Sequence, residues 1–166
     1  MSYKTLLVLI GMTLLSAAAY AQDAQKEINE QVWKPFISSF NSFDTDGFMA
    51  VHSRDVVRSP RDAKVLLSWN EYFTQQQAGD KKQKEDGSTR LIELRFTERI
   101  ANSNQAIDVG IYKTTVKNKE GKTSLFYGRF HVVLRKEGSQ WKILVDTDSS
   151  EGNTITEKDF MAASPL

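Results

Sequence analysis

The sequence predicts an α+β fold, with three N-terminal helices packed on a curved antiparallel sheet made of a four-strand meander and one short strand. Apolar residues in the first half recur at helical spacing. The second half consists of β-rich segments separated by short turn sequences. Helices followed by consecutive strands are typical of a layered α+β architecture.

The first 21 residues have the features of a secretory signal peptide. Lys4 supplies a positive charge, "LLVLIGMTLL" an apolar run, and "AYA" a small-residue cleavage pattern before Gln22. The apolar run is shorter than the roughly 20 residues that span a bilayer, and an uncleaved anchor is the alternative. We therefore expect cleavage after Ala21, a secreted or periplasmic protein, and no membrane attachment after cleavage. Residues 22–150 are expected to form the domain and residues 151–166 a C-terminal tail.

The composition excludes several classes of function. The 166-residue chain has no cysteine, which excludes disulfides, thiol catalysis and cysteine metal sites. Its 22 basic and 21 acidic residues nearly cancel, so a basic footprint for nucleic acid is missing. No nucleotide-binding or nucleophile motif occurs, and the two histidines, His52 and His131, lack metal-ligand spacing, so we expect no cofactor and no metal. A calcium loop over residues 146–157 is an alternative, but its glycine is one place late and a strand precedes it.

The helices are predicted from periodicity and capping. The first carries an apolar stripe with a spacing of four residues, made of Ile28, Val32, Phe36 and Phe40. Pro35 lies inside this stripe and predicts a kink or an early break. A second, short helix is expected over residues 44–53. The third is expected to begin at Ser68, which forms a capping box with Glu71, and to end in the polar stretch 78–88.

The strands are predicted from alternation and from turn residues. A brief strand, "VVRSP", ends at Pro60, and four longer ones are expected over residues 89–100, 105–116, 123–136 and 141–149. Their short links predict an antiparallel meander. Counting from the turns, the predicted opposed pairs are Glu137 with Gln140, His131 with Asp146, Arg129 with Asp148, Asp108 with His131, Tyr112 with Tyr127, Arg99 with Asp108, and Arg95 with Tyr112. The middle turn is the weakest link, because Gly121 is able to form a bulge.

This register gives the sheet two different faces. The apolar face would hold Phe96, Ile100, Ile107, Val109, Ile111, Phe130, Val132, Ile143 and Val145. The polar face would hold Arg95, Arg99, Asp108, Tyr112, Tyr127, Arg129, His131, Asp146 and Asp148. A polar face is often only a solvated surface. Here it also carries a Val133–Leu144 pair, and such a mixture of apolar wall and convergent polar groups is typical of a binding site.

The chain resembles the nuclear-transport-factor-2-like superfamily, which includes SnoaL-like cyclases, steroid delta-isomerase, scytalone dehydratase and the association domain of calcium/calmodulin-dependent kinase. The likeness lies in the order of elements and in "VWKPFISSFNSFDTDGFMAVHSRDVVRS" and "GRFHVVLRKEGSQWKILVDTDSS". It is greatest to uncharacterised secreted bacterial members. The resemblance implies a cone-shaped sheet around a pocket roofed by the helices, with the polar face as the pocket and His131 at the isomerase's oxyanion position. Fold analogy alone specifies no chemistry.

The leading hypothesis is a secreted module that binds a small polar or anionic molecule between helices and sheet. The residues expected to bind this ligand are Arg129, Asp148, Asp108, Tyr112, Tyr127, Arg95, Trp69 and Tyr72. One alternative is a cofactor-free isomerase, dehydratase or cyclase that uses His131 and Asp146 as its catalytic acid–base pair. A second alternative is a protein-interaction module with a vestigial pocket.

A homodimer is expected through the apolar face of the sheet. If that face points away from the helices, it exposes more apolar surface than the few hundred Å² a soluble monomer usually tolerates. A twofold contact would bury the patch on both copies. In the competing arrangement the helices cover Phe130 and Val132, and the charged face stays in water with no site at His131.

Overall fold

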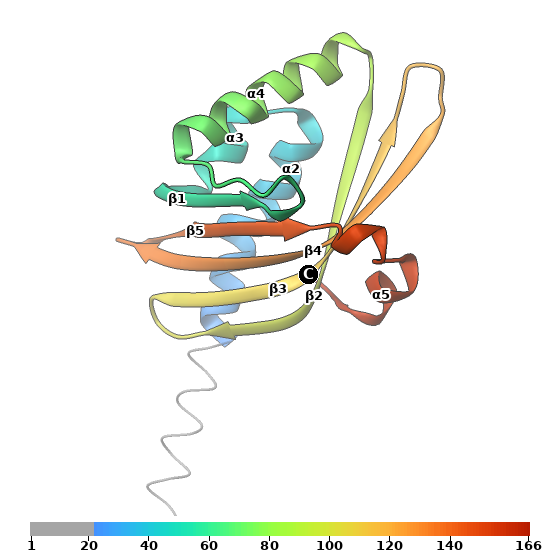
Figure 1. The fold of residues 1–166 in the computed structure, drawn as a ribbon. Coiled ribbons are helices and arrows are strands. Elements are labelled where there is room, and N and C mark those ends of the chain that lie inside the picture. Colours follow the sequence, from blue (N-terminus) through green and yellow to red (C-terminus); the bar gives the residue numbers. More distant parts are fainter. Residues whose placement is uncertain (1–21) are drawn as a thin grey trace, which may run out of the picture.

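The computed structural model describes residues 22–166, so the predicted signal peptide lies outside the described residues. The helices up to α4 cover one face of a six-stranded sheet with the order β1-β5-β4-β3-β2-β6 (Figure 1). The strands pair antiparallel except for β1 and β5, which are parallel. The predicted α+β class is therefore confirmed. Within residues 22–166, no helix is long and apolar enough to cross a membrane.

The described chain opens with one long, distorted helix. Residues 22–28 are α-helical, η1 (Asn29–Trp33) is a π-helical turn, and α2 (Lys34–Ser42) follows. Pro35 lies just after the π turn, and its missing N–H removes one backbone hydrogen bond from the helix. The π turn just before it is a known way for a helix to absorb such an irregularity. The helix is therefore distorted at the proline rather than broken.

The next elements differ from their predicted bounds. Helix α3 (Thr45–Ala50) is capped by Asp44, whose side chain accepts a hydrogen bond from the Gly47 N–H. It ends before strand β1 (His52–Pro60), which is longer than predicted and takes over the end of the predicted helix. A 3-10 turn, η2 (Arg61–Ala63), leads to α4 (Trp69–Glu85), which begins at the predicted capping box of Ser68 and Glu71.

The predicted four-strand meander is present. It consists of β2 (Thr89–Ala101), β3 (Gln105–Lys117), β4 (Thr123–Glu137) and β5 (Gln140–Ser149). The short strand β1 extends it beyond β5, in parallel orientation. This parallel pairing joins segments about ninety positions apart, which no turn signal in the sequence encodes.

The predicted pairing of His131 with Asp146 is wrong. The last turn is placed as expected, because Glu137 opposes Gln140. Leu144 is then an extra residue in β5, a β-bulge that shifts every later pair by one position. His131 consequently opposes Thr147, while Asp146 lies on the other face of the sheet.

Two further irregularities change the rest of the predicted register. Arg99 opposes Asp108 as expected, but Thr97 is an extra residue in β2 that shifts the pairs beyond it. The middle turn spans residues 118–122, with Gly121 at a φ of 85°. The pairs that replace the wrong predictions are Asp108 with Val132, Tyr112 with Gly128, Arg95 with Ile111, and Arg129 with Ser149.

The two faces of the sheet are therefore composed differently from the prediction. The helix-covered face carries buried apolar residues together with aspartates: Ile92, Leu94, Phe96, Asp108, Phe130, Val132, Leu134, Ile143 and Asp146. The outer face carries Val109 and Val145, as predicted, but also His131 and Arg129. Phe130 and Val132 are buried in the same core cluster as Val32 and Trp33, so the face that bears them packs under the helices.

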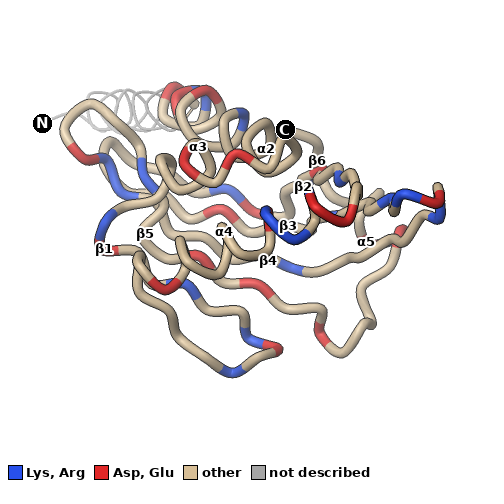
Figure 2. The backbone as a smooth tube through the Cα atoms, turned by 90° about the horizontal axis from the view of Figure 1, so that it is seen from above, with Lys and Arg blue, Asp and Glu red and all other residues tan. Residues whose placement is uncertain are grey.

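The C-terminal segment packs against the sheet. It contains a 3-10 turn, η3 (Glu151–Asn153), helix α5 (Glu157–Ala162) and strand β6 (Ser164–Pro165), which pairs with β2. Phe160 of α5 is buried in a small cluster with Ile111 and packs against Tyr127. Basic and acidic residues are interspersed along the described backbone (Figure 2), in keeping with the small net charge of the whole chain, +1.

Candidate functional site

A cavity of about 390 Å³ lies between the helices and the covered face of the sheet. Its wall is mainly aromatic and aliphatic, with polar groups among its lining residues. The lining residues are Trp33, Phe36, Phe40, Phe48, Arg58, Tyr72, Gln76, Ile92, Leu94, Tyr112, Thr114, Phe126, Phe130, Val132, Ile143, Asp146 and Asp148. Both the size and the composition are typical of pockets for small organic molecules.

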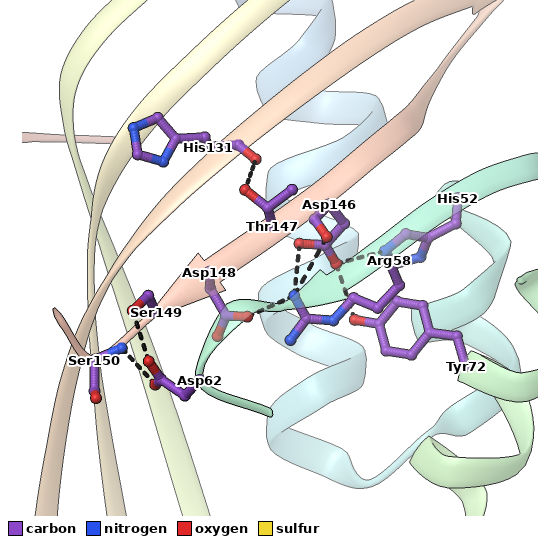
Figure 3. Close-up of polar contacts among 10 residues, drawn as sticks. All are labelled: His52, Arg58, Asp62, Tyr72, His131, Asp146, Thr147, Asp148, Ser149 and Ser150. Atoms are coloured by element: carbon purple, nitrogen blue, oxygen red, sulfur yellow. Dashed lines mark hydrogen bonds and ion pairs between the residues drawn. The ribbon is translucent and has the colours of Figure 1, made fainter. Parts of the chain in front are cut away.

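The polar groups come from four different elements. Asp146 and Asp148 project from β5, Arg58 from β1 and Tyr72 from α4 (Figure 3). Tyr112 projects from β3 beside them in the lining of the cavity. We call the group made of Arg58, Tyr72, Asp146 and Asp148 the polar wall.

Asp146 is the centre of the polar wall. The Tyr72 hydroxyl donates a 2.9 Å hydrogen bond to its Oδ2 atom. The Arg58 Nη1 atom lies 3.5 Å from Asp146 Oδ1 and 2.5 Å from Asp148 Oδ1, so one guanidinium pairs with both carboxylates. Arg58 also donates to the Asp146 backbone carbonyl at 3.3 Å and lies over the Tyr72 ring. These contacts fix the position of each group.

His52 lies behind the polar wall, at the start of β1. Its side chain is completely buried, and its Nε2 atom lies 3.4 Å from Asp146 Oδ2. On the other side of the ring, Nδ1 lies 2.9 Å from the Phe48 carbonyl oxygen, which only accepts hydrogen bonds. His52 thus orients Asp146 from behind and is not among the lining residues.

The electrostatic surroundings fix the charges of the wall. Burial opposes ionisation of Asp146, but Arg58, with His52 and Tyr72, outweighs it and holds the pKa of this carboxyl well below its ordinary range. Burial, reinforced by Asp146, raises the pKa of Tyr72 well above its ordinary value. Burial and then Asp148 raise the pKa of Tyr112 to about 12. Near neutral pH, Asp146 is therefore ionised and acts as a hydrogen-bond acceptor. Both tyrosines keep their protons and act as hydrogen-bond donors.

Tyr112 has room because of a glycine on the neighbouring strand. Gly128 opposes Tyr112 across β3 and β4. A Cβ atom at position 128 would clash with the Tyr112 hydroxyl and ring. The glycine therefore permits the tyrosine to lie across the sheet surface toward Asp148.

Four of the predicted site residues line the cavity. They are Tyr72, Tyr112, Asp146 and Asp148. The structure brings Asp146 and Asp148 together on the same face of β5, two residues apart. Asp146, which was predicted as a partner of His131, instead contacts Tyr72 and Arg58.

His131, Arg129, Tyr127 and Arg95 lie on the opposite face of the sheet. Figure 3 shows the His131 ring directed away from the polar wall. Burial and then the neighbouring Arg61 and Arg129 lower the pKa of His131. Arg129, Tyr127 and Arg95 contact the C-terminal segment. Arg129 pairs with Glu151, Tyr127 hydrogen-bonds to Glu157, and Arg95 donates to the Ala163 carbonyl. The bulge at Leu144 separates these side chains from Asp146 and Asp148, and the bulge at Thr97 separates Arg95 from Arg99.

The two remaining predicted residues have other contacts. Asp108 is completely buried on the covered face, but it accepts a 2.7 Å hydrogen bond from the Trp33 indole and pairs with Arg99. Trp69 stacks on Phe73 and lies under the Arg54 guanidinium, 3.7 Å from it. Neither side chain is among those that line the cavity.

The sequence reasoning missed Arg58 and His52. Both belong to β1, which was expected only as a brief strand, with His52 placed at a helix end. Arg58 opposes Asp146 through the parallel β1–β5 pairing. An arginine inside an apolar strand was the only available signal, and it gave no indication of its partner.

Comparison with known proteins identifies the fold. No protein-family model matches the chain, and no curated protein matches its sequence. Solved structures do match, among them a protein of unknown function from Shewanella oneidensis, described as NTF-2 like, with a TM-score of 0.60 and 18% identity over 76% of this chain and 98% of the other. An NTF2-like protein of unknown function from Pseudomonas putida matches with a TM-score of 0.60 and 14% identity, over 77% and 87%.

A third similar structure is described as a candidate scytalone dehydratase, from Novosphingobium aromaticivorans. Its TM-score is 0.60 and its identity 11%, over 79% of this chain and 86% of the other. This chain thus has the nuclear-transport-factor-2-like fold, as the resemblance implied. Because the identities are so low, the likeness defines the fold and leaves the chemistry to the site.

Proposed function

We propose that this protein binds a small molecule in the cavity between its helices and its sheet. The observation that carries the proposal is the cavity itself, about 390 Å³ in volume and lined by eight aromatic side chains beside one polar wall. A ligand with an apolar body and one polar end fits this arrangement. The apolar body would replace water against the aromatic rings, and the polar end would meet the groups around Asp148 and Tyr112.

Binding is favoured over the acid–base alternative. That alternative requires His131 and Asp146 to act on one substrate, but the two side chains lie on opposite faces of the sheet. Asp146 is a weak proton acceptor because its pKa is held low. Tyr72 and Tyr112 hold their protons, because their pKa values are raised.

A pair of neighbouring substitutions tests the proposal. Thr114 lines the cavity, whereas Thr115 is the next residue of β3 and projects to the other face. We expect Thr114→Trp to fill part of the cavity and to abolish binding of 2-naphthalenemethanol. Thermal shift and calorimetry measure this binding. Thr115→Trp is the control and should bind this aromatic alcohol as the wild type does. Equal binding by both variants would place the ligand elsewhere, and an absence of binding to the wild type would contradict the cavity as an apolar site.

We further propose that the protein acts outside the cytoplasm. The support is the leader pattern of residues 1–21, with its apolar run and its small-residue cleavage site before Gln22. Intact mass measurement of the protein from a secreting bacterial host should give a mature chain beginning at Gln22. A full-length chain retained in the cytosol would contradict the proposal.

We also propose that two copies pair through the outer face of the sheet. Five aliphatic residues form one directly paired row across five strands: Ile100, Ile107, Val133, Val145 and Val57. Among them Ile100, Ile107 and Val57 are exposed. This row replaces the surface predicted from the sequence, since Phe130 and Val132 belong to the core. Self-complementary apolar rows are suited to twofold contacts.

A further inference from the structure

The charged residues that line the cavity pair with one another. Among the described lining residues, the charged ones are Arg58, Asp146 and Asp148. Arg58 contacts both carboxylates through the same Nη1 atom, at 2.5 Å and 3.5 Å. Its charge is thus shared between two partners on β5, which leaves little attraction for an anion in the cavity.

His52 holds Asp146 from behind the wall. Its Nδ1 atom faces the Phe48 carbonyl oxygen, which requires a proton on Nδ1. Its buried Nε2 atom faces Asp146 Oδ2 at 3.4 Å and has no other hydrogen-bond partner in the described chain. Asp146 is thus held by Arg58, Tyr72 and His52, and Asp148 is held by Arg58, so both carboxylates already have partners.

A charged ligand would disturb this pairing. The remaining lining residues are uncharged and mostly apolar, so an ion that enters meets no opposite charge that is not already paired. Taking an ion out of water without such a partner is strongly unfavourable. An uncharged hydrogen-bonding group avoids that cost.

The groups at the polar end also indicate the kind of hydrogen bond that a ligand makes. Tyr112 lines the cavity, and its hydroxyl keeps its proton because its pKa is raised. Asp148 also lines the cavity; its Oδ1 atom is buried against Arg58, but its side chain is 24% exposed, so the carboxylate has room to accept a hydrogen bond. A ligand hydroxyl is able to accept from Tyr112 and donate to Asp148 at the same time.

We propose that the cavity selects an uncharged molecule, with an apolar, ring-containing body that ends in a hydroxyl or a similar group that both donates and accepts. The inference rests on the proposed binding function and names the ligand class. It replaces the polar or anionic ligand expected from the sequence. The reason for the change is that Arg58 is neutralised by Asp146 and Asp148, and that His131 and Arg129 lie on the other face.

Three matched probes test the inference on the wild-type protein. They are 2-naphthalenemethanol, 2-naphthoate and 2-naphthylmethylammonium, which share one aromatic body and differ in charge. Calorimetry at pH 7 should show the alcohol binding at least about tenfold more tightly than either ion. If an ion binds as tightly as the alcohol, the inference is wrong while the binding function stands. If none of the three binds, the binding function itself is contradicted.

Charge-changing variants test the inference through the affinities of the three probes relative to one another, so the absolute affinities do not matter. Asp148→Asn removes one of the two carboxylates that share Arg58, so 2-naphthoate should gain at least about tenfold relative to the alcohol. Arg58→Gln shifts the balance the other way and should favour 2-naphthylmethylammonium. Arg129→Gln removes a charge from the outer face and should leave the wild-type order unchanged. Circular dichroism and size-exclusion chromatography establish that each variant is folded, and an unchanged order in a folded Asp148→Asn protein would overturn the inference.

Discussion

At the scale of the residue, the site depends on one buried carboxylate that is held by groups from several elements. Asp146 accepts a hydrogen bond from Tyr72 and contacts Arg58 and His52. Because it is held so fully, it serves less as a reactive base than as an anchor that positions the residues around the cavity. The same contacts link the stability of the protein to pH.

The first prediction concerns stability in acid. The pKa of Asp146 is lower in the folded protein than the value of about 3.9 in an unfolded chain. Its ionised form therefore stabilises the fold above about pH 4, and this contribution is lost as the pH falls toward the folded-state pKa. We expect the free energy of unfolding in urea to fall more steeply between about pH 5 and pH 2 in the wild type than in Asp146→Asn.

The comparison with Asp146→Asn isolates one carboxyl group among several. Other carboxylates with a lowered pKa occur in both proteins and contribute to both curves: Glu27, Asp62, Glu71, Glu137 and Asp159. Parallel curves for the two proteins would show that Asp146 is not held in its ionised form by the fold.

At the scale of the element, single inserted residues determine which side chains enter the cavity. Leu144 in β5 and Thr97 in β2 are β-bulges, and each shifts the pairs beyond it by one position. Since side chains alternate between the faces of a strand, one extra residue moves the rest of the strand to the other face. The bulge at Leu144 thus brings Asp146 and Asp148 to the helix-covered face while His131 stays outside.

The second prediction concerns the packing of two neighbouring strands. Gly128→Ala should destabilise the protein by about 2 kcal/mol or more, because the new Cβ atom clashes with the Tyr112 ring and displaces it. The same variant should bind 2-naphthalenemethanol more weakly, since Tyr112 lines the cavity. Urea unfolding and calorimetry measure the two effects.

Gly79→Ala is the matched control for this substitution. Gly79 lies within α4, and a Cβ atom there would have no atom within 4 Å. The control should therefore be neutral or more stable by up to about 1 kcal/mol, as alanine is favoured in helices. Equal effects of the two substitutions would mean that Tyr112 adapts without cost.

At the scale of the whole molecule, the two faces of the sheet have separate roles. The covered face forms the core and the cavity together with the helices. The outer face carries the aliphatic row across five strands, and α5 covers the sheet beside it at Ile111. Adjacent residues of one strand therefore belong to entirely different surroundings.

The last prediction uses two adjacent valines of β4. Val132 is buried under the helices, so Val132→Arg places an unpaired charge in the core and should prevent stable folding. Val133 lies in the outer aliphatic row, so Val133→Arg should leave the protein folded and convert a dimer into a monomer. Circular dichroism reports the folding and sedimentation at micromolar concentration the assembly. A wild-type protein that sediments as a monomer would contradict the proposed dimer.

Local sequence patterns specify the class of fold and most of its elements. The apolar stripe from Ile28 to Phe40, the capping box at Ser68 and the three turns of the meander are local signals, and the structure has the elements that they predict. The sequence also placed four cavity residues among its candidates: Tyr112, Asp146 and Asp148, which stand out inside apolar strands, and Tyr72 of the third helix.

Long-range packing determines which residues of the site meet. The bulge at Leu144 carries no clear local signature, yet it separates His131 from Asp146 by reversing the alternation of the strand. The parallel pairing that brings Arg58 to Asp146 joins distant segments, so no turn could reveal it. A local sequence pattern fixes the period of a strand, whereas its register depends on every strand and helix packed against it.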